Sequence, residues 1–260
     1  MRHLASFVFS SGSFAATVNT PSLHSTARLL MDKQSLSRPT STASLITTAL
    51  SKNNDDDSTQ HIKPKILCLH GKYQSGAILR NKISGARRKL EREYELHFID
   101  GPILLDNEEE AFAWWNRSED GKHTLVREAF EYVFEQTKAE QYDAIIGFSQ
   151  GGTLATSLAV SGVLPSIRVV ITAGSPYIPE AFEIATELSK TSNSNGLDIP
   201  KLHMAGETDA MVPVDSTSEL CEKGGNGQLI VHDQGHLFPT RSARVREILD
   251  FLAVALKKDE

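Results

Sequence analysis

Short apolar runs alternate with longer amphipathic stretches from Lys65 to the end of the chain. The short runs predict strands near residues 65–70, 95–99, 143–147, 168–172, 201–205 and 228–232. The amphipathic stretches predict helices near residues 78–92, 121–138, 150–161, 179–190, 214–222 and 240–256. Strands that alternate with helices in this way favour a parallel sheet with helices on both faces. We therefore predict an α/β fold built on a six-stranded, mainly parallel sheet.

A serine lies at the turn between the third predicted strand and the helix that follows it. The segment Gly147-Phe148-Ser149-Gln150-Gly151 has the G-x-S-x-G pattern of a nucleophile elbow. Glycines on either side let strand and helix approach closely, and the sharp turn lifts the serine hydroxyl above the sheet. The alternative is an ordinary strand-to-helix turn whose glycines serve packing. We predict that Ser149 is a catalytic nucleophile.

A serine nucleophile needs a histidine base and an acid, which in this architecture follow it in the order acid, then histidine. Asp209 lies in the loop after the predicted strand 201–205, and His236 lies in the loop after strand 228–232. Both loops leave the carboxyl ends of strands, the edge at which open α/β sheets bind ligands. We predict a triad of Ser149, Asp209 and His236.

Other residues compete for these roles. Glu207 lies nearer to its strand than Asp209, Asp215 suits the start of the next helix, and Asp233 adjoins the strand that precedes the histidine. His232 and His236 have the i,i+4 spacing of a helical metal pair. That stretch reads instead as a strand followed by a loop, so we predict no metal ion there. Catalysis by the triad requires no organic cofactor either.

The oxyanion of an acyl-transfer intermediate needs two hydrogen-bond donors. One donor should be the backbone N–H of Gln150, and the other should come from the loop that follows an earlier strand. Strand 65–70 opens into such a loop at Gly71 and Lys72. We predict that the backbone N–H groups of Lys72 and Gln150 form the oxyanion hole, and that His70 shapes this loop.

A long insertion, residues 101–121, follows the second predicted strand and carries both tryptophans of the chain. A loop at that edge can overhang the site, so we expect it to bind an apolar acyl chain. The candidate side chains are Leu104, Leu105, Phe112, Trp114 and Trp115. The alternative is that the tryptophans anchor the loop to the core. We expect the acidic segment 107–110 to begin a solvated helix, and to disfavour strongly anionic substrates if it flanks the entrance.

Several of these segments together resemble a known family. They are Ile66 to Gly71, Ser75 to Arg80, Glu95 to Pro102, Gly147 to Gly151, and Gly235-His236 with Pro239. From about Lys63 onward the chain resembles the eukaryotic family of serine hydrolases (FSH-type), a compact α/β-hydrolase. The Gly-Phe-Ser-Gln-Gly segment also occurs in acyl-protein thioesterases and carboxylesterases.

The resemblance implies a serine esterase that acts on carboxylic esters or thioesters through the predicted triad. The chain departs from the family at two positions, since Lys72 replaces a common aromatic residue and Gln234 replaces a common glycine. The lysine at position 72 affects the expected substrate preference and leaves the expected mechanism unchanged. The alternatives are an acyl-protein or lysophospholipid thioesterase and a catalytically silent binding protein.

The composition of the chain bears on the number of domains, on membrane insertion and on the cellular compartment of the protein. The chain has 260 residues, of which 40% are hydrophobic, so residues 61–260 are expected to form one domain. No apolar run approaches the roughly 18 residues of a membrane span. Two cysteines do not make a disulfide framework, which favours an intracellular protein. We expect a small-molecule or lipid-like ester as the ligand.

The first 54 residues differ from the rest in charge. They carry five basic residues and one acid, which gives this segment a net charge of +4. Because the whole chain has a net charge of −6, the remaining residues carry −10. An acidic body argues against nucleic-acid binding. Arginine, abundant serine and scarce acids are typical of transit peptides, so residues 1–60 are predicted to be a disordered extension that targets a mitochondrion or plastid. A cytoplasmic extension and a secretory signal are the alternatives.

Overall fold

The computed structural model describes residues 62–105, 111–192 and 195–257. The chain divides into two units, residues 1–58 and 59–260, and only the second contains described residues. The predicted N-terminal extension, its targeting role and the acidic segment 107–110 lie outside the described residues. None of the described helices is long and apolar enough to cross a membrane.

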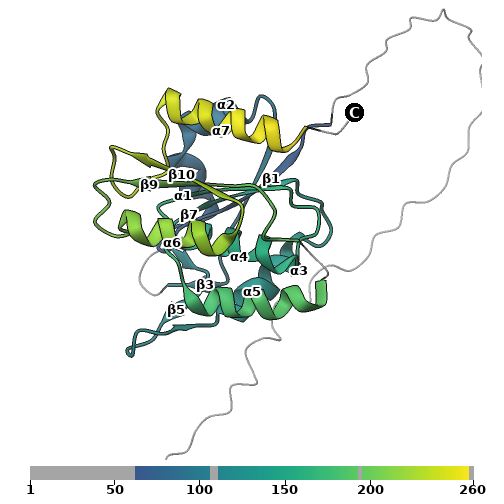
Figure 1. Cartoon of the computed structure of the whole chain (residues 1–260), viewed down its shortest axis with the longest axis vertical. Coiled ribbons are helices and arrows are strands. Elements are labelled where there is room, and N and C mark those ends of the chain that lie inside the picture. The colour runs from purple at the N-terminus through teal and green to yellow at the C-terminus, as the bar shows by residue number, and fades with distance from the viewer. Residues whose placement is uncertain (1–61, 106–110, 193–194, 258–260) are drawn as a thin grey trace, which may run out of the picture. The chain divides into compact units, whose positions relative to one another are not determined.

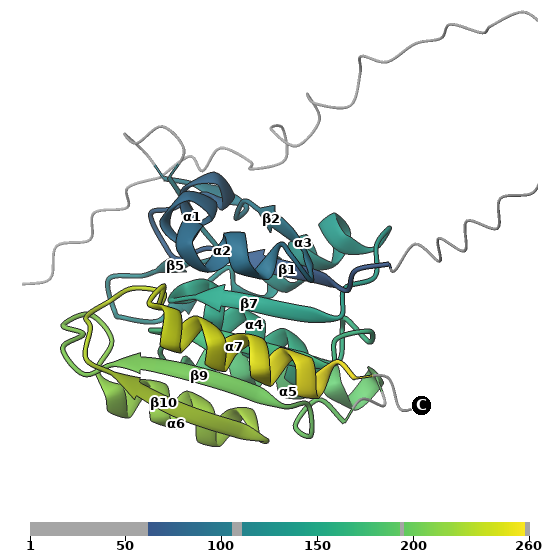
Figure 2. The ribbon, with the colours of Figure 1, turned by 90° about the horizontal axis from the view of Figure 1, so that it is seen from above.

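Within the described residues, six parallel strands form one sheet in the order β10-β9-β8-β7-β1-β2 (Figures 1 and 2). The strands are β1 (Lys65–Leu69), β2 (Glu95–Ile99), β7 (Ala144–Phe148), β8 (Val169–Ala173), β9 (Lys201–Gly206) and β10 (Gly227–His232). The central strands β7, β8 and β9 are buried along their whole length because helices cover both faces of the sheet. The predicted six-stranded parallel sheet is confirmed.

Helices pack on both faces of this sheet (Figure 1). One apolar core includes side chains of α1 (Gly76–Lys82), α2 (Ser84–Leu90) and α7 (Ser242–Ala255). The other includes side chains of α3 (Val126–Thr137), α4 (Gln150–Ser161), α5 (Pro179–Ser192) and α6 (Val214–Gly224). Neighbouring residues of a strand contribute to opposite cores, as Ile145 and Ile146 of β7 do.

Two predicted helices differ from the structure. The helix expected over 78–92 is split into α1 and α2 at Ile83, whose φ of −92° and ψ of 18° leave the helical range and whose side chain is fully buried. The helix expected over 121–138 begins only at Val126. Its predicted first turn belongs to a hairpin in which β5 (Asn116–Arg117) pairs antiparallel with β6 (His123–Thr124).

A second hairpin pairs β3 (Ile103–Leu104) with β4 (Phe112–Ala113). Its partner strands are two residues long, which is too short to show an alternating pattern in the sequence. Both hairpins follow β2, so the described part of the predicted insertion, residues 101–105 and 111–121, is folded at the carboxyl edge of the sheet.

Three buried histidines make stability depend on pH. Burial lowers the pKa of His70, His203 and His232, in the case of His203 to about 3. In the unfolded chain these histidines have an ordinary pKa of about 6.5 and become protonated below that pH. In the native chain they stay neutral to lower pH, so the unfolded state binds more protons. The free energy of unfolding should therefore fall as the pH drops below about 6.5, by up to about 1.4 kcal/mol per pH unit for each histidine.

Urea unfolding between about pH 4.5 and pH 7 measures this slope. His203→Asn should make the slope shallower by about one histidine's share, because it removes the most strongly shifted group. A slope that is the same in the variant and the wild type would contradict the assignment.

Candidate active site

Ser149 occupies a strained turn between β7 and α4. Its φ of 51° and ψ of −120° lie in the positive-φ region that side chains rarely adopt, and its N–H donates to the carbonyl of Ala173 at 2.9 Å. A Cβ at Gly147 would lie 2.4 Å from the Gly151 carbonyl oxygen, and a Cβ at Gly151 would lie 2.4 Å from that of Leu69. Only glycine fits at either position, and the turn therefore directs Ser149 away from the packed interior.

The structure brings the Ser149, His236 and Asp209 side chains together at the carboxyl edge of the sheet. Ser149 Oγ lies 3.1 Å from His236 Nε2, and His236 Nδ1 lies 2.7 Å from Asp209 Oδ2. Because the carboxylate can only accept, Nδ1 carries the proton and donates it. Nε2 is then the acceptor for the Ser149 hydroxyl. This arrangement prepares the imidazole to remove the hydroxyl proton.

Asp209 is itself held in place. Its side chain is fully buried, and its Oδ1 accepts the backbone N–H groups of Met211 and Val212, each at 2.8 Å. The His236 ring packs against the ring of Phe148, with 4.9 Å between centroids. A buried carboxylate with both oxygens occupied can orient the imidazole and stabilise its charged form.

The competing acids lie elsewhere. Glu207 and Asp215 are exposed, Asp215 in the first turn of α6 after the capping residue Pro213. Asp233 is exposed and forms an ion pair with Arg241, with its oxygens 2.7 and 2.8 Å from Nη1. In the part of the chain that the structure describes, no group of His, Cys, Asp or Glu side chains is arranged to hold a metal ion.

His70 orders the loop that follows β1. Its Nε2 accepts the Gly101 N–H at 2.8 Å, so Nδ1 carries the proton and donates to the Gly71 carbonyl at 2.7 Å. Its ring stacks on that of Trp114, with 5.0 Å between centroids, and the Trp114 indole N–H donates to the His70 carbonyl at 2.8 Å. Burial lowers the pKa of His70, which keeps the imidazole neutral in this network.

The predicted oxyanion donors, Lys72 and Gln150, both line the pocket that contains Ser149. Among the described residues, neither backbone N–H has a hydrogen-bond acceptor. Both amides are thus available to an acyl oxygen, and their role as oxyanion donors stays a prediction.

The Gln150 side chain has a role that the sequence did not indicate. Its Oε1 accepts the backbone N–H of Trp114 at 3.0 Å, and its Nε2 donates to the Trp115 carbonyl at 2.9 Å. One amide side chain thus joins the nucleophile elbow to the segment after β4. The G-x-S-x-G pattern drew attention only to the backbone amide of this residue.

The pocket at Ser149 has a volume of about 800 Å³. Of the five side chains predicted to hold an acyl chain, Trp115 lines it, and Leu104, Leu105, Phe112 and Trp114 do not. Trp114 is fully buried in the core against His70, while Leu104 is 61% exposed. Trp114 and Trp115 lie in a bend between β4 and β5, and both side chains are buried in the same apolar core. Both therefore anchor the insertion to the core, and only Trp115 also lines the pocket.

The remaining apolar walls come from side chains that the sequence analysis did not predict to contact substrate. They are provided by α1, β7 and the loops after β8 and β10, through Leu79, Ile83, Phe148, Ile178, Leu237 and Phe238. Three basic side chains, Lys72, Lys82 and Arg117, also line the pocket.

Comparison with known proteins adds independent findings. The family model described as "Serine hydrolase (FSH1)" matches residues 59–248. The chain is 26% identical over 230 residues to "Uncharacterized hydrolase C22A12.06c" of Schizosaccharomyces pombe, covering 76% of this chain and 52% of the relative. It is 26% identical over 220 residues to "Esterase OVCA2" of Bos taurus, covering 72% and 95%. The chain therefore spans about half the length of the yeast relative and nearly all of the bovine one.

Among solved structures, Arabidopsis thaliana SOBER1 superposes with a TM-score of 0.56. The match covers 75% of this chain and all of SOBER1, with 19% sequence identity. At this identity the likeness concerns the fold, which is that of the α/β-hydrolases.

Gln150→Ala should lower the free energy of unfolding by about 1–3 kcal/mol, because the buried Trp114 N–H and Trp115 carbonyl lose their partner. Chemical denaturation measures the change. Gln141→Ala, which removes the same side chain from an exposed position, should leave stability unchanged. A Gln150→Ala variant as stable as the wild type would show that the bridge contributes nothing.

Proposed function

We propose, from the premise that the chain belongs to the serine hydrolase (FSH1) family, that it cleaves carboxylic esters through an acyl-Ser149 intermediate. The chain is a serine esterase-type hydrolase. The observation that carries the residue assignment is the pair of hydrogen bonds from Ser149 to His236 and from His236 to Asp209. This chemistry needs no metal or organic cofactor, because the nucleophile, the base and the oxyanion donors all come from the chain.

The first half-reaction transfers the acyl group to the enzyme. Ser149 Oγ attacks the ester carbon while His236 Nε2 removes the hydroxyl proton, and Asp209 stabilises the imidazolium through Nδ1–H. The tetrahedral oxyanion accepts hydrogen bonds from the backbone N–H groups of Lys72 and Gln150. As the carbonyl re-forms, the C–O bond to the leaving group breaks and His236 Nε2–H protonates the alkoxide.

The second half-reaction returns the enzyme to its starting state. A water molecule bound where the alcohol left gives a proton to His236 Nε2 and adds to the acyl carbon. The bond to Ser149 Oγ then breaks, and the imidazolium returns its proton to the serine oxygen. The product is a carboxylic acid, and the turnover consumes one water.

The substrate contacts are apolar near the nucleophile. Trp115, Ile178 and Phe238 line the same pocket as Ser149, and their burial indicates walls that exclude water from an acyl chain. An apolar acyl chain is therefore part of the proposal. A thioester is the second candidate, because its thiolate can leave by the same route and because the Gly-Phe-Ser-Gln-Gly motif also occurs in acyl-protein thioesterases.

Ser149→Ala should lower kcat for 4-nitrophenyl butyrate by about 10⁶, and Asp209→Asn should lower it by less, about 10⁴. Steady-state kinetics on the purified variants measure both, with thermal melts to show that each variant is folded. Asp215→Asn and Asp233→Asn serve as matched controls, since both carboxylates are exposed and the His236 ring bonds Asp209 and Ser149 instead.

The acid assignment would be wrong if Asp233→Asn abolished turnover and Asp209→Asn did not. A folded wild-type protein that turns over neither oxyesters nor thioesters would favour the alternative of a silent binding protein.

A further inference from the structure

The Ser149 pocket is lined by basic side chains in a chain that is acidic as a whole. Lys72, Lys82 and Arg117 all line it, and no Asp or Glu among the described residues does. The chain carries a net charge of −6, so this concentration of positive charge runs against its overall balance. A cleft with apolar walls and charges of one sign focuses the field on whatever enters it.

No carboxylate among the described residues neutralises these three cations. Within the described part of the chain, none of them forms an ion pair, whereas other basic residues such as Arg87, Arg168 and Arg241 do. The Lys72 ammonium lies 5.0 Å from the ring centroid of Tyr73, a contact that leaves its charge intact.

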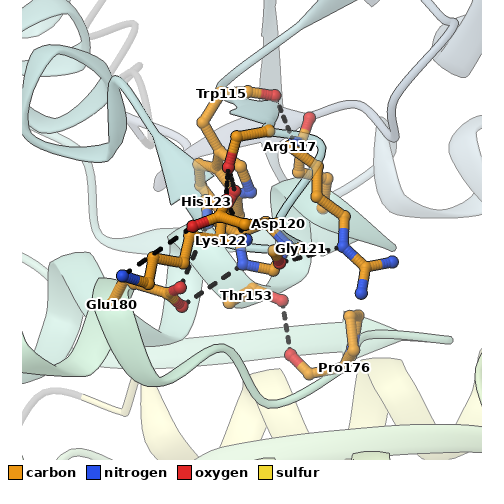
Figure 3. A network of polar contacts seen from close by, with 11 residues as sticks. Trp115, Arg117, Asp120, Gly121, Lys122, His123, Thr153, Pro176 and Glu180 are labelled. Atoms are coloured by element: carbon orange, nitrogen blue, oxygen red, sulfur yellow. Dashed lines mark hydrogen bonds and ion pairs between the residues drawn. The ribbon is translucent and has the colours of Figure 1, made fainter. Parts of the chain in front are cut away.

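Arg117 is the most precisely positioned of the three. Its Nε donates to the Gly121 carbonyl at 3.0 Å, across a turn closed by hydrogen bonds from the Ser118 N–H to the Lys122 carbonyl and from the Gly121 N–H to the Ser118 carbonyl. Gly121 adopts a φ of 86°, which suits glycine. No dashed contact joins the two terminal nitrogens of the guanidinium to any other residue drawn in Figure 3, and Arg117 lines the pocket together with Pro176.

The hairpin that carries Arg117 is anchored at both ends (Figure 3). At one end, Gln150 of the elbow donates to the Trp115 carbonyl at 2.9 Å. At the other end, the His123 N–H donates to Glu180 Oε1 at 3.1 Å, and His123 Nδ1 lies 3.2 Å from Glu180 Oε2. The backbone that carries Arg117 is therefore fixed relative to the nucleophile, and the Nε hydrogen bond to Gly121 directs its exposed side chain.

We infer that this pocket selects esters or thioesters that carry an anionic group, a carboxylate or a phosphate, which the free guanidinium edge of Arg117 binds with support from Lys72 and Lys82. Arginine presents two parallel N–H donors that match these oxyanions. The apolar part of the substrate lies along Trp115 and Ile178, between the anion and the acyl carbon. The inference rests on the proposed ester hydrolysis and adds the substrate class.

The sequence analysis holds the opposite expectation, that the acidic segment 107–110 disfavours strongly anionic substrates if it flanks the entrance. That segment lies outside the described residues. The substrate preference of the wild-type protein decides between the two.

Two matched substrate pairs test the inference and separate the sources of the charge. 4-Nitrophenyl hydrogen glutarate is compared with 4-nitrophenyl pentanoate, which places a carboxylate on the acyl chain. Butyryl-coenzyme A is compared with butyryl-N-acetylcysteamine, which places phosphates on the leaving group. In at least one pair, kcat/KM for the anionic member should exceed that of the neutral member by about tenfold, mostly through KM, because one charge-assisted contact is gained. The excess should shrink as ionic strength rises.

Arg117→Gln should reduce that ratio about tenfold, because it removes the charge and the paired donors. Arg88→Gln is the matched control: Arg88 is exposed, lies outside the pocket and likewise donates through Nε to a backbone carbonyl, that of Ser84 at 3.3 Å. It should leave the ratio unchanged.

A ratio of one or less in both pairs, or a ratio that Arg117→Gln does not change, would overturn the inference. If the folded wild-type protein turned over none of the four substrates, the proposed ester hydrolysis itself would fail. These outcomes are therefore distinguishable.

Discussion

The contact between β7 and α4 at Gly147 and Gly151 is the constraint on which the site depends. With no Cβ at either glycine, the helix begins against the strand, and the backbone of Gly151 lies close to the carbonyls of Leu69 and His70. This contact forces Ser149 to its positive φ and places the start of α4 beside the loop after β1. The nucleophile and both candidate oxyanion donors are thus fixed by one packing arrangement, before any substrate binds.

The parallel sheet supplies the rest of the catalytic arrangement, and this much was predictable. Ser149, Asp209 and His236 each follow an apolar run, and parallel strands bring their carboxyl ends to one edge. The orientation of side chains in the insertion was not predictable, because strands two residues long leave no pattern to read. Trp114 and Trp115 look equivalent in the sequence, and both pack in the same core, yet only Trp115 also lines the pocket.

The concentration of basic side chains in the pocket was not predictable from the sequence either. Lys72, Lys82 and Arg117 come from a loop, the end of a helix and a hairpin, and only tertiary packing brings them to one cavity. The Gln150 bridge is a similar case, since it joins segments 35 residues apart. Under the proposed function, chemistry and selectivity are separate in this chain: the elbow and the triad would serve any acyl group, and the surrounding cavity would determine which acyl groups reach them.

The central claim is that Ser149 is an activated nucleophile, and a fluorophosphonate probe tests it most directly. The probe reacts covalently with a serine whose proton is removed by a neighbouring base, and peptide mass spectrometry locates the adduct. The account predicts a single adduct on the peptide that contains Ser149, lost in Ser149→Ala and strongly slowed in His236→Ala. A folded wild-type protein without an adduct, or with the adduct on a serine outside the elbow, would contradict it.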